Sequence, residues 1–183
     1  MRQRSGETID QGPQAPAEEP APSVIVALVM LIVTVAACGA YIALNVVAGT
    51  QESYAGFFFL LFWGGLQKSD LRLFPSSAIG SFAGLALGLL MHQLQLRFGS
   101  TGLIAFLAIL LTVLFLYFRQ KLRFALNEAT MLMLTLSTVL HVQAYASFQG
   151  LFISLAIAVV FFGAILWGVL RLRAQAPQPA SAN

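Results

Sequence analysis

The sequence predicts an all-α integral membrane protein of six transmembrane helices, with both termini in the cytoplasm. Three observations support this fold class. Hydrophobic residues make up 58% of the 183 residues and charged residues only 9%, against about 25% charged in soluble domains. The apolar residues lie in runs, and most runs approach the about 20 residues that a helix needs to cross a bilayer. The basic residues stand between these runs, almost all on one side.

The positions of the basic residues give the predicted orientation. Nine of the ten lysines and arginines fall on one side of six spans, and only Arg97 falls on the other. Basic residues near span ends are retained in the cytoplasm, so that side is the cytoplasm. The nine are Arg2, Arg4, Lys68, Arg72, Arg119, Lys121, Arg123, Arg171 and Arg173. The net charge of +3 then reflects anchors for anionic lipid headgroups, and we expect a lipid bilayer and no nucleic acid as partner.

Both ends of the chain are polar. Residues 1–22 are rich in Pro, Gln and Glu and lack an apolar period, so we expect a disordered cytoplasmic tail. A second such tail is expected over 172–183, which leaves 23–171 as one transmembrane domain. Val35-Ala36-Ala37-Cys38 resembles a lipoprotein cleavage box, but the apolar run continues to Val47. This continuation favours an uncleaved span, and whether the box is processed stays open.

The six spans are predicted at about 23–48, 54–66, 75–96, 102–118, 127–145 and 151–170. The third begins with Pro75, which suits the first position of a helix because its missing N–H needs no partner there. The fourth has Thr112 as its only polar interior residue and is expected to face lipid. Aromatic residues fall near the expected interfaces, where amphipathic rings prefer to lie. They are Trp63, Tyr117 and Trp167 on the cytoplasmic side, and Tyr54 and Tyr145 on the outer side.

The second span is the weakest element. Residues 54–66 rise only about 20 Å as a helix, less than the about 30 Å of a bilayer core. It is either a re-entrant segment or a helix extended over 51–53 in a locally thinned bilayer. We favour a crossing helix, because a re-entrant segment would place three basic residues outside instead of one.

Small residues recur along one edge of the third span. Ser76, Gly80, Gly84 and Gly88 stand at intervals of four residues, which stacks them on one helix edge and lets another backbone approach closely. The spacing predicts a helix-packing seam, with a substrate-lining groove as the alternative. His92 extends this edge and needs a polar partner or water, because imidazole in hydrocarbon is costly.

The fifth span has a polar stripe that covers about a third of its circumference. Its members are Asn127, Thr130, Ser137, Thr138, His141 and Tyr145. Such a stripe faces the bundle interior or a watery cavity. Together with the first and third spans it predicts a substrate-binding cluster toward the outer side, made of Tyr41, Asn45, His92, Thr138, His141 and Tyr145. The same residues are also suited to plain interhelical hydrogen bonding.

Catalytic and metal sites are not predicted. Outside the tails the carboxylates are Glu52, Asp70 and Glu128, and none is paired with another. No metalloprotease, phosphate-loop or nucleophile-elbow motif occurs. Two histidines and one cysteine show no ligand spacing for a metal. We therefore expect no enzyme activity, no cofactor and no metal.

The two cytoplasmic turns that precede the third and fifth spans resemble each other. One reads Gln67-Lys68-Ser69-Asp70-Leu71-Arg72-Leu73-Phe74, and the other reads Gln120-Lys121-Leu122-Arg123-Phe124. A duplicated hairpin would explain this likeness. The general occurrence of basic residues in cytoplasmic turns would explain it equally well.

Two family resemblances rest on short motifs. Tyr54-Ala55-Gly56-Phe57, Gly64-Gly65 and the Ser/Gly-rich stretch 76–88 resemble the core of a family of small bacterial inner-membrane proteins classed as a domain of unknown function. The likeness extends over most of 24–171 and implies a bacterial inner-membrane location. Arg72 followed by Gly80-Ser81-Phe82-Ala83-Gly84 resembles the membrane half of fusaric-acid-resistance-type aromatic exporters, with Ser81 in place of a threonine. This second resemblance implies export.

These observations predict a small inner-membrane transporter or channel-like protein that binds or moves a small solute. Six short helices leave little interior for a pathway, so we expect a homo-oligomer or a membrane partner subunit. The alternative is a membrane scaffold or accessory subunit, whose polar residues only pack helices.

Overall fold

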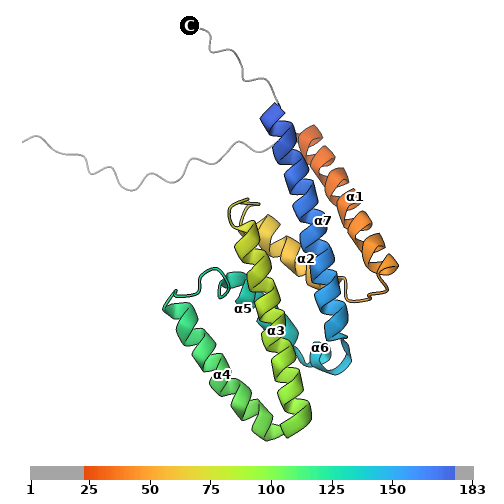
Figure 1. The fold of residues 1–183 in the computed structure, drawn as a ribbon. Coiled ribbons are helices and arrows are strands. Elements are labelled where there is room, and N and C mark those ends of the chain that lie inside the picture. The colour runs from red at the N-terminus through yellow and green to blue at the C-terminus, as the bar shows by residue number, and fades with distance from the viewer. Residues whose placement is uncertain (1–22, 176–183) are drawn as a thin grey trace, which may run out of the picture. The chain divides into compact units, whose positions relative to one another are not determined.

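The computed structural model describes residues 23–175, except for the side chains of 140–141 and 173–175. The predicted tail 1–22 and residues 176–183 of the second tail lie outside this range. Every regular element within it is a helix, as Figure 1 shows, and the all-α prediction is confirmed for these residues. The elements are α1 (Val24–Val47), α2 (Tyr54–Leu60), a π-helix η1 (Leu61–Leu66), α3 (Phe74–Phe98), α4 (Ser100–Phe118), α5 (Glu128–Thr138), α6 (Leu140–Tyr145) and α7 (Phe148–Gln175).

Four helices among the described residues, α1, α3, α4 and α7, are long and apolar enough to cross a membrane. The chain is therefore an all-α protein suited to a bilayer. The apolar side chains of α4 are largely exposed, for example Ile104, Leu111 and Phe115, as expected for a helix that faces lipid. The remaining two predicted spans differ from single long helices, so six spans stay a prediction.

The second predicted span is two short pieces in line. α2 continues directly into the π-helix η1, and Gly64 and Gly65 lie in its last turn. The end of this piece is held by the indole of Trp63, whose Nε1 donates to the carbonyl oxygen of Asp70 at 2.9 Å. This second span therefore has about the predicted length of 20 Å. The expected extension of the helix back over 51–53 is wrong, because Glu52 is not helical.

The fifth predicted span is interrupted, which corrects the expectation of one helix over 127–145. α5 ends at Thr138, and Val139 is extended with φ −60° and ψ 134° before α6 begins. Side-chain hydroxyls near the break bond to backbone carbonyls three or four residues earlier, and such bonding bends helices. Thr135 bonds to Met131, Ser137 to Leu134 and Thr138 to Thr135, at 2.8–3.0 Å. No proline or glycine occurs at the break, so the sequence alone does not indicate it.

The chain divides into two compact units, residues up to Ala37 and residues from Cys38 onward. In the second unit α3 is central: it packs against α5, α4 and α7, while α2 packs against α7. Its apolar core includes Tyr41, Phe59, Leu85, Met133 and Leu155, all fully buried.

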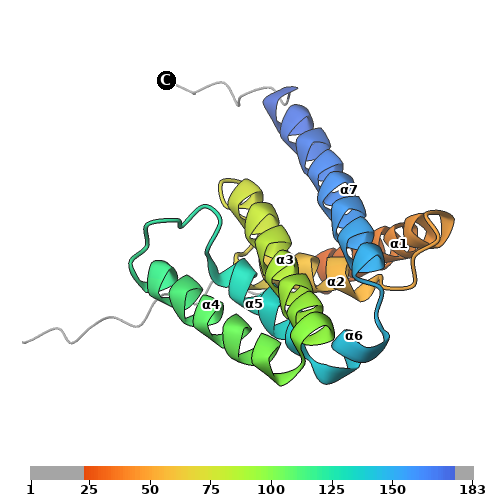
Figure 2. The same cartoon turned by 60° about the horizontal axis from the view of Figure 1, so that its bottom comes forward.

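Helices α3 and α7 run in opposite directions, as Figures 1 and 2 show, so the start of α3, the end of α4 and the end of α7 lie at one end of this unit. The α2–α3 turn, the α4–α5 turn and Arg171 are the basic segments at that end. Arg171 lies over the ring of Trp167, 3.9 Å from its centroid. The predicted cytoplasmic charges in these segments therefore share one end of the unit, whereas Arg97 lies in the last turn of α3 at the opposite end.

Candidate functional site

The glycine edge of α3 lies directly against α5. A Cβ atom added to Gly84 would meet the backbone oxygen of Thr130 at 2.5 Å, and one added to Gly88 would meet the hydroxyl of Ser137 at 2.0 Å. A Cβ atom on Gly80 would overlap the side-chain amide of Asn127 at 2.1 Å. Only glycine allows the two backbones to approach this closely. We call this contact the α3–α5 seam.

Much of the polar stripe of α5 is used in this seam. Thr130 and Ser137 are fully buried. Asn127 caps the helix: its Oδ1 accepts from the backbone N–H groups of Ala129 and Thr130 at 3.0 and 3.2 Å, an arrangement typical of helix starts. Its Nδ2 donates to the carbonyl oxygen of Ser76 at 2.7 Å. Ser76, the first small residue of the predicted seam, thus meets α5 through its backbone.

The far end of the seam is closed by Gln143 of α6. Its Nε2 donates to the carbonyl oxygens of Ser137 at 2.6 Å and of Gly88 at 3.2 Å. Because the helix breaks at Val139, the carbonyl of Ser137 lacks its usual helical donor, and the Gln143 amide replaces it. Both donations fix the orientation of the amide, so its Oε1 faces His92 Nδ1 at 3.2 Å. His92 Nδ1 must therefore carry the hydrogen and donate it.

Tyr41 and Asn45 belong to a different group of contacts. The Tyr41 hydroxyl lies 2.6 Å from the hydroxyl of Ser154 in α7 and donates to the carbonyl oxygen of Ser53 at 2.8 Å. Gly56 makes room for it, because a Cβ atom there would lie 2.1 Å from the Tyr41 oxygen. Asn45 Nδ2 donates to the Tyr41 carbonyl, and its Oδ1 accepts from Thr50 at 3.0 Å. These bonds tie α1, α2 and α7 together.

The predicted substrate cluster is therefore distributed over two groups. His92 bonds to Gln143 of α6. Tyr41 bonds to Ser53 before α2 and to Ser154 of α7, and Asn45 bonds to the Tyr41 carbonyl and to Thr50. Thr138 is half-buried and bonds within its own helix. Tyr145 is 79% exposed, and the side chain of His141 lies outside the described part of the structure.

A carboxylate anchors the start of α7. Glu52 Oε1 accepts from the backbone N–H of Ser147 at 3.0 Å, close to the positive end of the helix dipole. Gly150 leaves space for this carboxylate, since a Cβ atom there would lie 2.1 Å from Glu52 Oε2. Glu52 thus joins the α1–α2 loop to the start of α7.

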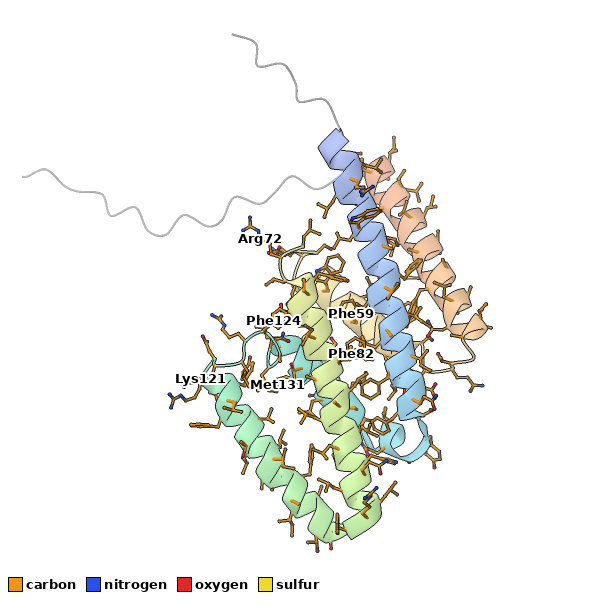
Figure 3. The ribbon with its side chains drawn as sticks, in the orientation of Figure 1. Phe59, Arg72, Phe82, Lys121, Phe124 and Met131 are labelled. Atoms are coloured by element: carbon orange, nitrogen blue, oxygen red, sulfur yellow. The ribbon has the colours of Figure 1, made fainter. Side chains whose placement is uncertain are left out.

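A cleft of about 760 Å³ opens where the α2–α3 turn and the α4–α5 turn meet. Its lining combines cationic, amide and aromatic side chains with one carboxylate. The lining residues are Gln67, Arg72, Leu73, Pro75, Ser76, Tyr117, Phe118, Gln120, Arg123, Phe124, Leu126, Asn127 and Glu128. Figure 3 labels Arg72 on one turn and Phe124 on the other, with Lys121 pointing outward from the second turn. We call this site the turn cleft.

Both turns of the turn cleft hold residues in the left-handed backbone region. Lys68 and Ser69 have φ of 50° and 57°, and Gln120 has φ of 53°. Such values in non-glycine residues cost energy and often occur at functional sites. The first turn is held by the Asp70 carboxylate, which accepts from the backbone N–H of Arg72 at 2.9 Å. Gln67 Oε1 accepts from Ser77 Oγ, which fixes that amide against α3.

The two arginines of the turn cleft are exposed. Within the part of the chain that the structure describes, neither of them forms an ion pair. Glu128 is the only carboxylate on the cleft wall. The starts of α3 and α5 and the ends of η1 and α4 all lie at the cleft, so the partial charges of their helix dipoles largely cancel and the two arginines outweigh the one carboxylate. The site is therefore electropositive.

Two features of the site were missed from the sequence. In a continuous helix Gln143 would lie about 120° away from Ser137 and off the polar stripe. Only the break at Val139 brings its amide within hydrogen-bond distance of the Ser137 carbonyl oxygen. The sequence does not predict the turn cleft either, although the turns that begin with Gln67 and Gln120 resemble each other. Their similarity was the available signal, because equivalent turns at one end of a bundle can line the same space.

Protein-family models, curated proteins and solved structures were compared with this chain, and none of them matches it.

Proposed function

We propose that this chain is a small membrane transporter that binds a small solute in the turn cleft and passes it across the bilayer. The observation that carries the proposal is the cleft itself. Its volume of about 760 Å³ lies within the range of about 300–1,000 Å³ that is usual for small-molecule sites. The predicted orientation places it on the cytoplasmic side of a bacterial inner membrane.

The broken helix α5–α6 supports movement as well as binding. Transporters often place discontinuous helices beside the substrate path, because half-helices can shift against a fixed bundle. Here the opposite end of the α3–α5 seam is closed by Gln143, and Val139 lies outside the helical hydrogen-bond pattern. Release of the Gln143 amide from Gly88 and Ser137 would open the outer end. The described conformation then corresponds to a carrier open toward the cytoplasm.

The second candidate function is a membrane scaffold or accessory subunit. One observation favours it: Asn127, Thr130 and Ser137, part of the stripe predicted to face the bundle interior or a watery cavity, contact the glycine edge of α3. In that case the polar residues only pack helices, and the turn cleft would be the place where a partner docks.

Cysteine labelling distinguishes the two candidates. In a Cys38→Ala background, Ser76→Cys reports on the turn cleft and Thr138→Cys on the helix break. A membrane-impermeant maleimide is added to inside-out and to right-side-out vesicles that contain the full chain. We expect Ser76→Cys to react from the cytoplasmic face and Thr138→Cys to react from the outer face, because a carrier exposes its two ends to opposite sides.

The contrary result would be protection of Thr138→Cys on both faces, with reaction restored after denaturation. This would indicate a dry seam without an outer opening and would contradict transport in favour of the scaffold. Ser100→Cys is the matched control, because Ser100 is exposed just after the end of α3. Its labelling checks that the reagent reaches the outer face.

A further inference from the structure

The charge of the turn cleft indicates the chemical class of its ligand. Arg72 and Arg123 contribute two positive charges and Glu128 one negative charge. The starts of α3 and α5 add about half a positive charge each, and the ends of η1 and α4 add about half a negative charge each. The sum is about +1, and within residues 23–175 no ion pair neutralises either arginine. A cavity of this charge favours an anion.

The two arginines stand on separate turns. Arg72 comes from the α2–α3 turn and Arg123 from the α4–α5 turn, and both line the same cavity. A guanidinium binds phosphate or carboxylate oxygens with two parallel hydrogen bonds. Two guanidinium groups that approach from separate turns suit a group with several oxygens on different sides. A phosphate monoester offers three such oxygens and carries about two negative charges. A phosphodiester offers two that diverge from a tetrahedral phosphorus and carries one charge, whereas the two oxygens of a carboxylate are coplanar.

The lining of the cleft also includes three aromatic side chains. Tyr117 and Phe118 at the end of α4 line it together with Phe124. Phe118 is 71% exposed and Phe124 58% exposed, so their rings reach beyond the cleft. In the predicted orientation they lie near the membrane interface, where an apolar chain attached to the phosphate group would meet the bilayer. A lipid with an anionic headgroup and an apolar chain would therefore contact both the arginines and the aromatic rings.

We propose that the turn cleft binds the phosphate group of a phosphate ester between Arg72 and Arg123. This inference rests on the proposed solute site and specifies its ligand class. The phosphate belongs either to an anionic phospholipid headgroup, as in basic pockets between membrane helices, or to a soluble phosphate ester. Both sources share the same recognition chemistry.

The chain supplies its own matched controls. Lys68 precedes Arg72 in the first turn and Lys121 precedes Arg123 in the second, and neither lysine lines the cleft. Arg72→Gln and Lys68→Gln remove the same charge from the same turn, as do Arg123→Gln and Lys121→Gln. Any effect on membrane orientation or on general attraction of anions is therefore shared within each pair, and only contact with a ligand in the cleft differs.

The test measures thermal unfolding of the full chain in phosphatidylcholine nanodiscs at constant ionic strength. One arm adds phosphatidylglycerol to the nanodisc, and the other adds soluble glycerol 3-phosphate. We expect at least one arm to raise the unfolding midpoint of the wild-type chain. Arg72→Gln and Arg123→Gln are expected to weaken apparent affinity about tenfold or more, since each removes charge-assisted hydrogen bonds. Lys68→Gln and Lys121→Gln are expected to retain it.

A response to phosphatidylglycerol alone would identify a lipid headgroup, and a response to glycerol 3-phosphate alone would identify a soluble ester. The proposal is overturned if neither arm shifts the midpoint, or if the lysine variants lose affinity as much as the arginine variants. Cysteine labelling reports on the proposed function separately. If Ser76→Cys in the cleft reacts with maleimide but neither phosphate ester binds, this inference is contradicted and the proposed transport function is not.

Discussion

The α3–α5 seam and the turn cleft share the starts of α3 and α5, yet they differ in packing and in charge. In the seam, glycines on α3 face buried hydroxyl groups on α5, and an added Cβ atom would overlap its neighbours. In the turn cleft, about 760 Å³ of open space is lined by uncompensated arginines and exposed aromatic rings. Asn127 takes part in both, since it lines the cleft and also bonds to Ser76 across the seam.

The difference teaches that polarity within an apolar helix does not by itself indicate a binding site. The hydroxyl groups of α5 satisfy backbone and seam contacts, whereas the charged residues at the turns have no protein partner of opposite charge in the described residues. Substitutions in the seam should therefore change stability, and substitutions in the cleft should change binding.

The largest effect is expected for Gly84→Ala. The new methyl group would lie 2.5 Å from the Thr130 carbonyl oxygen and 2.9 Å from the backbone nitrogen of Leu134, and backbone atoms cannot yield without moving α5. We expect a loss of about 3 kcal/mol in the free energy of unfolding, measured by denaturant titration in micelles. Gly168→Ala on α7 is the control, because nothing lies within 4 Å of its Cβ position. Equal effects at both glycines would contradict the close approach in the seam.

Gln143→Leu should destabilise the chain somewhat less. It removes the donor to Gly88 and Ser137 and the acceptor for His92. At about 0.6 kcal/mol for each hydrogen bond in a membrane protein, the loss is about 2 kcal/mol. Unfolding of Gln93→Leu, an exposed position on α3, provides the comparison. If Gln143→Leu were as stable as Gln93→Leu, the amide would not hold the α5–α6 break.

Asn127→Ala tests the residue that the two regions share. Loss of the helix cap costs about 1 kcal/mol, and the bond to Ser76 is lost as well. Asn127→Asp keeps an acceptor for the Ala129 and Thr130 N–H groups but cannot donate to Ser76, and it adds a negative charge to the cleft. We expect Asn127→Asp to unfold closer to wild type than Asn127→Ala does, and to bind glycerol 3-phosphate or phosphatidylglycerol more weakly. Parallel unfolding and binding titrations would show whether the two effects separate.

The smallest effect on stability is expected for Arg123→Gln. The side chain is exposed and forms no ion pair in the described residues, so the free energy of unfolding should change by less than about 0.5 kcal/mol. The same denaturant titration in micelles gives the value. A loss comparable to that of Gly84→Ala would show that Arg123 supports the fold, and the contrast between seam and cleft would fail.

Much of the fold could be predicted because bilayers impose strong local rules. The apolar runs at 24–47, 74–98, 100–118 and 148–172 became long helices, and the four-residue spacing of Gly80, Gly84 and Gly88 indicated one helix edge. The partner of that edge was less predictable. Tyr41 shares the polar character of the α5 stripe, but its hydroxyl bonds to Ser53 before α2 and to Ser154 of α7, because side-chain polarity does not specify which neighbour satisfies it.

The sequence by itself determined the class of protein, the long helices and the side on which its charges gather, because hydrophobicity, helix length and charge act locally along the chain. Only the tertiary structure decided the break at Val139, the turn of the Gln143 amide toward Gly88, and the meeting of Arg72 with Arg123 in one cleft. The last two depend on residues about 50 positions apart in sequence, and contacts between such residues are settled only when the helices pack.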